Sequence, residues 1–203
     1  VEGINRKQLL PGGLQIVPYY DRSKLVDAAL ATVSRVLVEG IVLVIVILFL
    51  FLGDVRSSLI VIATLLVTPA VTFLAMNTLG MSANLMSLGG LAIAIGLMID
   101  GSVVIVENVY SRLARADGQT KFRIVYEAAC EVGVPVTFGV GVIILVFLPL
   151  MTLQGMEGKL FAPLAYTIAI ALTVSLAVSL TLSPVLCLFF LRGGHEHETH
   201  LVR

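Results

Sequence analysis

Apolar residues along this chain gather into five long runs, which short polar segments separate. A helix that crosses a bilayer needs about 20 mostly apolar residues, and each run approaches or reaches that length. The pattern predicts an all-α, polytopic membrane protein built as a bundle of five transmembrane helices. In chain order the predicted spans cover about residues 36–52, 59–76, 85–107, 132–151 and 165–191, within a transmembrane region of 35–191.

The first 34 residues are more polar and are expected to lie outside the bilayer. Residues 14–18 alternate in polarity and end at a proline, which favours a short strand. Asp21 can cap a helix that begins near Ser23. Apolar positions then recur with a helical period opposite a charged side, so we expect an amphipathic helix along the membrane surface. Because the chain opens on Val1 and not on methionine, we expect residues 1–34 to be the tail of a longer protein's water-exposed domain.

The segments between the spans are short. We expect a tight polar turn at residues 53–56, an uncharged loop at 77–84, a turn at Asp117 and Gly118, and a loop at 155–161. Pro69 lies in the middle of the second span and is expected to kink it.

Composition agrees with a membrane location. The chain is 58% hydrophobic and 13% charged, whereas about a quarter of the residues in soluble domains are charged. Neither a basic run nor an aromatic and basic cluster points to nucleic acid. Cys130 and Cys187 lie far apart without a CxxC spacing, so they indicate neither a disulfide framework nor a zinc site.

Basic residues alternate between the two sides of the predicted spans. One set of polar segments contains Arg56, a cluster of four basic residues at 112–123 and the tail 192–203, while the opposite short loops contain only Lys159. By the positive-inside rule the first set is cytoplasmic. This places the N-terminal segment outside the cytoplasm, and the third span then runs inward from residue 85.

The third span carries two carboxylates, Asp100 and Glu107. A charge at the centre of a span costs about 3 kcal/mol on the translocon scale, so such residues call for a reason. Seven residues apart, the two acids lie nearly on one helix face, separated by about 10 Å along the axis. A carboxyl group removed from water can bind and release a proton near neutral pH, and an acidic stripe inside a helix bundle therefore indicates a proton path. Alternatively, Glu107 only marks the helix end at the water interface.

The motif GLMIDGSVVIVEN resembles the fourth transmembrane helix of the resistance-nodulation-division (RND) superfamily, specifically of its heavy-metal efflux branch. DRSKLVDAALATV, FLGDVRSSL, MSLGGLAIAIG and EGKLFAPLA resemble the same branch in the same order. The resemblance covers essentially the whole chain. It implies a fragment of a bacterial inner-membrane permease with twelve transmembrane helices in two halves, of which this chain supplies helices two to six.

The resemblance also implies how the whole protein works. The implied protein is a proton antiporter and not an enzyme, with the proton as coupling ion, a metal cation as cargo and no resident cofactor. Three subunits are expected to assemble and to work with a periplasmic adaptor and an outer-membrane channel. Asp100 matches the family's proton-carrying aspartate and Glu107 the glutamate two turns below, and both work with a lysine from the missing half. The fragment alone is expected not to pump.

The ion stays open at this stage. Zinc, cobalt and cadmium pumps tend to carry an aspartate where this chain has Ala94. Met86 and Met98 match methionines of copper and silver pumps, whose thioethers suit Cu(I), although a methionine in a membrane helix also serves simply as packing. Ile105, Leu172 and Cys187 depart from the copper and silver pattern. His195, His197 and His200 in the cytoplasmic tail could hold an ion or bind metal only adventitiously.

Three other functions are alternatives. A drug or lipid exporter of the same superfamily usually has two adjacent aspartates here, whereas Ile99 precedes Asp100. An intramembrane protease is suggested only by HEHETH, in which Thr199 replaces the second histidine of HExxH. The fragment could also be a purely structural membrane domain, in which Asp100 would show no pH-linked titration.

Overall fold

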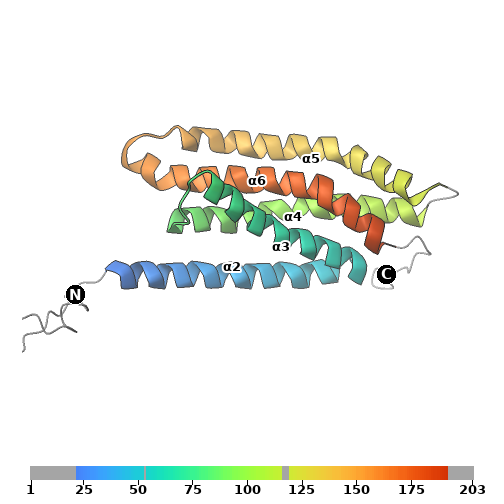
Figure 1. Ribbon diagram of the computed structural model, residues 1–203, viewed down its shortest axis with the longest axis horizontal. Helices are drawn as coiled ribbons and strands as arrows, with labels where there is room; N and C mark the ends of the chain where they lie inside the picture. Colours follow the sequence, from blue (N-terminus) through green and yellow to red (C-terminus); the bar gives the residue numbers. More distant parts are fainter. Residues whose placement is uncertain (1–21, 53, 116–118, 192–203) are drawn as a thin grey trace, which may run out of the picture.

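The computed structural model describes residues 22–52, 54–115 and 119–191, and nearly all of this part of the chain is helical (Figure 1). Each helix is long and apolar enough to cross a membrane, which confirms the predicted five-helix membrane fold. The strand expected at 14–18 lies outside the described residues. The helices are α2 (Arg22–Leu52), α3 (Val55–Thr78), α4 (Leu85–Ala114), α5 (Lys121–Met151) and α6 (Gly155–Phe190).

Helix α2 differs from its prediction. The amphipathic segment and the first span form one continuous helix of 31 residues, so the segment does not turn away to lie separately along a membrane surface. The reason is local, because no proline interrupts the sequence and the i→i−4 bonds can run on without a break. Arg35 and Glu39 form an exposed ion pair one turn apart, with Nε and Oε1 separated by 2.7 Å.

Two predicted turns are shorter than expected. Helix α3 already begins at Val55, where the Asp54 carboxylate accepts a hydrogen bond from the Ser57 backbone at 3.1 Å and caps the helix. The prediction of a loop at 155–161 is wrong, because α6 begins at Gly155 and only residues 152–154 connect it to α5. The polar residues that suggested a loop instead form the first turns of the helix. Gly158 permits this start, because a Cβ there would lie 2.1 Å from the Leu153 carbonyl oxygen.

Helices α4 and α6 form the centre of the bundle. Helix α4 packs against all four other helices, whereas α2 and α5 lie on opposite sides and do not touch each other (Figure 1). Small residues let the two central helices approach closely. A Cβ on Gly90 would lie 2.7 Å from the Leu164 carbonyl oxygen of α6, and one on Gly101 would lie 3.5 Å from the Ser179 hydroxyl oxygen of α6.

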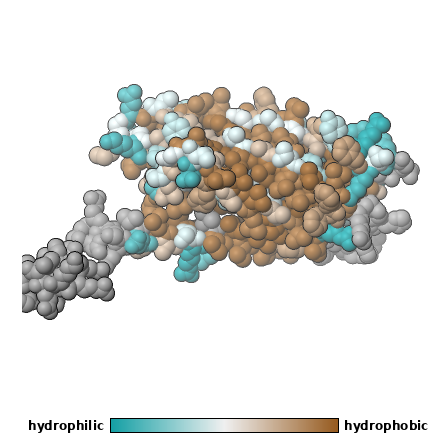
Figure 2. All heavy atoms as spheres, viewed as in Figure 1, coloured by the Kyte–Doolittle hydropathy of each residue, from teal (hydrophilic) through white to brown (hydrophobic). Residues whose placement is uncertain are grey.

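The surface of the bundle is apolar over its middle. Figure 2 shows hydrophobic residues covering the centre of the molecule, while hydrophilic residues gather at its two ends. Large apolar side chains such as Leu43 and Phe138 are exposed on the surface of the bundle. Such a belt between two polar ends is what a bilayer requires of a spanning bundle.

Candidate functional site

Helix α4 begins at Leu85, the residue predicted, and its start is fixed by a reciprocal cap. The Asn84 side chain accepts from the Ser87 backbone at 2.8 Å, while the Ser87 hydroxyl accepts from the Asn84 backbone at 2.8 Å. Two backbone donors at the helix start are thereby satisfied. This cap sets the register of everything that follows along α4.

Asp100 and Glu107 are both exposed in the five-helix bundle. They share their side of α4 with Ile93, which is 49% exposed, with Val104, which is 41% exposed, and with Gly96, where a Cβ would meet nothing within 4 Å. We call these five residues the open face of α4. None of the other four helices covers it. The opposite side is packed: Leu91, Ala94, Ile95, Met98, Ile105, Val106 and Val109 are buried.

An open face of this kind is costly against lipid. A charged carboxylate at the centre of a span costs about 3 kcal/mol in hydrocarbon, and acids in spans face a protein interior or a water-filled cavity. The open face of α4 therefore suits contact with further protein or water, and not with acyl chains.

Near Asp100, polar contacts fix α4 on the side opposite its open face. The Ser175 hydroxyl of α6 donates to the Met98 carbonyl oxygen at 3.2 Å. Ser102 lies on the α3 side, where it lines a small cavity of about 10 Å³ with the buried Thr64 and Thr68 of α3. The helix is thus fixed through its backbone and its buried polar side chains, while the acid side chains stay free to contact something else.

The two candidate metal ligands lie far apart. Met98 is 4% exposed and packs in an apolar cluster that includes Leu91 and Leu172, whereas Met86 is half-buried. Twelve residues of helix separate them by about 18 Å, so they cannot bind the same ion. Among the residues that the structure describes, no group of three His, Cys, Asp or Glu side chains could hold a metal. The histidines at 195, 197 and 200 lie outside the described residues.

Polar contacts that sequence reasoning missed lie at the C-terminal end of α4. Asn108 donates to the Ala128 carbonyl oxygen of α5 at 2.9 Å and to Glu131 at 3.2 Å, and Arg112 forms an ion pair with Glu131. These partners lie 19 to 23 positions apart, so no local sequence signal links them. Lys121 donates to the Leu188 carbonyl oxygen and so satisfies one of the last carbonyl groups of α6.

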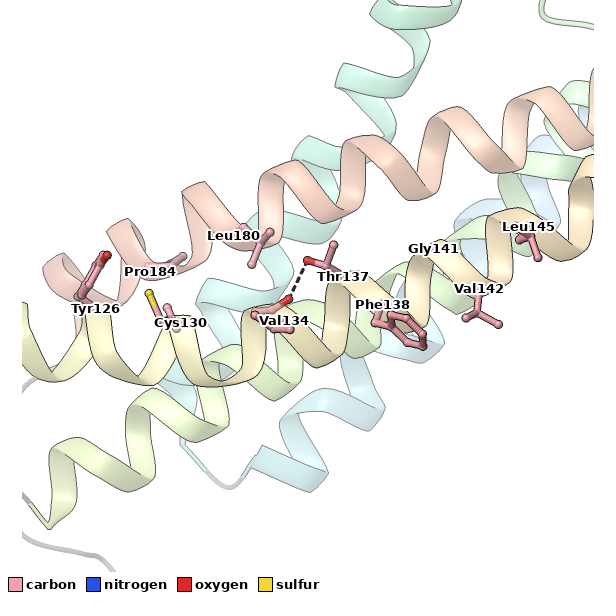
Figure 3. A pocket seen from close by; sticks show the side chains of 12 residues that line it. Tyr126, Cys130, Val134, Thr137, Phe138, Gly141, Val142, Leu145, Leu180 and Pro184 are labelled. Atoms are coloured by element: carbon pink, nitrogen blue, oxygen red, sulfur yellow. Dashed lines mark hydrogen bonds between the residues drawn. The ribbon is translucent and has the colours of Figure 1, made fainter.

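A large groove lies along α5 and α6, and neither Asp100 nor Glu107 lines it. It has a volume of about 960 Å³, and apolar side chains of α5 and α6, such as Phe138 and Leu180, form most of its wall (Figure 3). The Thr137 hydroxyl in the groove already donates to the Gly133 carbonyl oxygen at 2.7 Å. None of the described residues that line the groove is charged, so these residues offer no carboxylate for proton or cation binding.

A sequence model of the AcrB/AcrD/AcrF family matches residues 2–203. The chain belongs to the AcrB/AcrD/AcrF family. Among its curated relatives, the cobalt-zinc-cadmium resistance protein CzcA of Cupriavidus metallidurans is 45% identical over 199 residues, which is 94% of this chain and 18% of CzcA. The cation efflux system protein CusA of Escherichia coli K12 is 38% identical over 196 residues, 92% of this chain and 19% of CusA.

A solved structure supports the same assignment. The X-ray crystal structure of a heavy metal efflux pump matches with a TM-score of 0.77 and 38% identity, over 91% of this chain and 18% of that one. These matches confirm the resemblance to the heavy-metal efflux branch of the RND superfamily. The chain spans about a fifth of the length of the AcrB/AcrD/AcrF family members it matches.

Proposed function

We propose that this chain is part of a proton-driven efflux transporter for heavy-metal cations, in which α4 supplies a section of the proton path. The observation that carries the proposal is the open face of α4. Two carboxylates lie on one side of a long apolar helix, and the rest of the described bundle leaves that side uncovered. Family members named for cation efflux support the cargo class.

The proposed role of the acids follows from their surroundings. A carboxyl group in a medium of low dielectric constant favours its neutral form, while a nearby positive charge favours the ionised form. Asp100 can therefore alternate between two states as a cation on a facing helix approaches or withdraws. The resemblance assigns that cation to a lysine of the missing half. Each proton taken up on one side and released on the other can then drive the cargo in the opposite direction.

Orientation and assembly are part of the proposal. The basic residues at one end of the bundle support a cytoplasmic location for the C-terminal end of α4 and a periplasmic location for the N-terminal segment of the chain. Glu107 then lies on the cytoplasmic side of Asp100, in a bacterial inner membrane. The family relationship supports a trimer that works with a periplasmic adaptor and an outer-membrane channel.

The function can be tested with a deletion strain. Loss of the full-length protein is expected to lower tolerance of heavy-metal salts and to leave tolerance of dyes and detergents unchanged, because the family members it matches are named for metal cations. The measurement is growth inhibition across both sets of compounds, with the complemented strain as control. Unchanged metal tolerance together with new dye sensitivity would favour the drug-exporter alternative.

Met86 and Met98 are proposed as separate soft ligands along α4, since thioethers suit Cu(I) and Ag(I). Changing both to leucine in the full-length protein is expected to reduce copper and silver tolerance while zinc tolerance stays the same. Leucine keeps the volume, and such swaps usually cost less than about 1.5 kcal/mol, so protein yield should hold. Equal tolerance of all three metals in the variant and the wild type would show that both side chains serve only as packing.

A further inference from the structure

Asn108 follows Glu107 directly, but its side chain does not share the open face of α4. Its Nδ2 donates to the Ala128 carbonyl oxygen at 2.9 Å and to Glu131 Oε2 at 3.2 Å, and both of these partners belong to α5. A primary amide has two N–H donors, and here both are used. Because both partners are acceptors, the amide nitrogen must point toward α5.

Arg112 reaches the same carboxylate from one turn further along α4. It donates to Glu131 Oε2 and forms an ion pair with it. Glu131 is thus bound by two residues of α4 that lie four positions apart and on one side of that helix. Hydrogen bonds to an ionised group are about twice as strong as those between neutral groups. We call Asn108, Arg112 and Glu131 the α4–α5 clamp.

The clamp differs from the neighbouring polar contacts. The other two ion pairs of the described residues, Arg35–Glu39 and Arg123–Glu127, each lie within a single helix. Only the clamp joins two helices by an ion pair in this part of the chain. It borders a cavity of about 350 Å³ lined by Asn108, Ser111, Arg112, Arg115, Gln119, Ile124, Glu127 and Glu131.

The remaining charges at this end of the bundle are few. Among the described residues, Arg115 lies at the C-cap of α4 and Arg56 in the first turn of α3, which Asp54 precedes. No charged residue in the described parts of α2 or α6 lies here. On α5, Lys121 is bound to the Leu188 carbonyl oxygen and Arg123 to Glu127. The clamp is therefore the main polar contact that sets α4 against α5 beside Glu107.

We propose that Asn108 is a positioning residue of the proton path, an inference that rests on the proposed function. Successive helix residues point about 100° apart. Holding Asn108 and Arg112 against α5 therefore turns Glu107 away from α5 and onto the open face, in line with Asp100. Without the clamp the end of α4 can rotate, and Glu107 no longer follows Asp100 along one path. Proton transfer slows, whereas the binding of the metal cargo is untouched.

The test uses the full-length protein in proteoliposomes, with metal-driven proton flux followed by an enclosed pH dye. Asn108→Asp removes both N–H donors and places a second carboxylate beside Glu131. We expect the turnover number to fall about tenfold or more. A hydrogen bond to a charged group contributes about 1.5 kcal/mol or more, and a loss of that size corresponds to about a tenfold change in rate. The KM for the metal ion should not change.

A second variant distinguishes the loss of the Asn108–Glu131 contact from a nonspecific disturbance of the fold. The pair Asn108→Asp with Glu131→Gln exchanges the amide and the carboxylate between the two helices. The amide introduced on α5 can then donate to the carboxylate introduced on α4, while its oxygen still accepts from Arg112. This double variant is expected to recover part of the turnover, because the contact with residue 131 is restored while the hydrogen bond to the Ala128 carbonyl oxygen stays lost. Glu127→Gln is the matched control, because the ion pair that it removes, with Arg123, lies within α5 and does not join α5 to α4. Turnover should stay at the wild-type value.

Two results would overturn the inference: wild-type turnover in Asn108→Asp, or a double variant as slow as the single variant at equal yield of folded protein. Asn108→Ala removes the donors without adding charge and serves where Asn108→Asp fails to accumulate, with the same expected direction. The proposed function is judged separately by Asp100→Asn. If that protein still moves protons, the proposed function fails. If it is inactive while Asn108→Asp is fully active, only the positioning role is lost.

Discussion

Replacing Asp100 with asparagine in the full-length protein is expected to abolish proton-coupled metal export. Asparagine has nearly the same size and can still form hydrogen bonds, but its amide cannot carry a proton at any accessible pH. Groups that transfer protons in a rate-determining step contribute about 100-fold or more, so export should fall at least that far. The measurement is metal-driven proton flux in proteoliposomes, together with metal tolerance of cells that produce the variant.

Control variants show whether the loss of export comes from the missing proton transfer or from a loss of folded protein. Asp100 is exposed in the bundle, so the substitution disturbs no contact within the described helices, and the yield of folded protein should match the wild type. Asp100→Glu keeps an ionisable group and should retain part of the activity. Glu107→Gln should reduce flux less than Asp100→Asn, because Glu107 lies nearer the end of the span and closer to water. Wild-type export by Asp100→Asn would end the proton-path proposal.

The sequence predicted the number, order and type of the helices because long apolar runs leave little alternative. In a bilayer each backbone polar group must be satisfied within the segment, which makes such a run a helix. The start of α4 at Leu85 was predicted from the apolar run that follows the loop at 77–84, and the structure adds the Asn84–Ser87 cap that fixes it. Where helix formation depended on weaker local signals, as at residues 155–161, the prediction was wrong.

Features that depend on tertiary contacts could not be read in the same way. Periodicity places Asp100 and Glu107 on one face of α4, but which face the other helices cover depends on how the small residues of α4 and α6 pack. The contact of Asn108 with Glu131 joins positions 23 residues apart. No local sequence pattern at either residue predicts this contact. Met98 matched a metal-ligand pattern, although its burial beside Leu172 is equally that of a packing residue.

The α4–α6 contact supplies the second large prediction. Gly90→Ala places a Cβ 2.7 Å from the Leu164 carbonyl oxygen and 3.3 Å from the Leu164 Cα. Both atoms belong to the backbone of α6, which cannot yield as a flexible side chain can. Overpacking of this kind costs about 1–3 kcal/mol. We expect the full-length protein to unfold at a lower temperature in detergent. We also expect it to lose export activity, because a displaced α4 carries Asp100 and Glu107 away from their positions in the proton path.

Gly89 offers a matched control one residue away on the same helix. A Cβ there meets nothing within 4 Å, and alanine lowers the entropy cost of ordering a helix by about 0.5–1 kcal/mol relative to glycine. Gly89→Ala should therefore be as stable as the wild type or slightly more so. The two variants differ only in whether the added methyl group points into α6. Equal unfolding temperatures for both would show that the close approach at Gly90 is not what holds α4 in place, and the orientation of the open face would then need another cause.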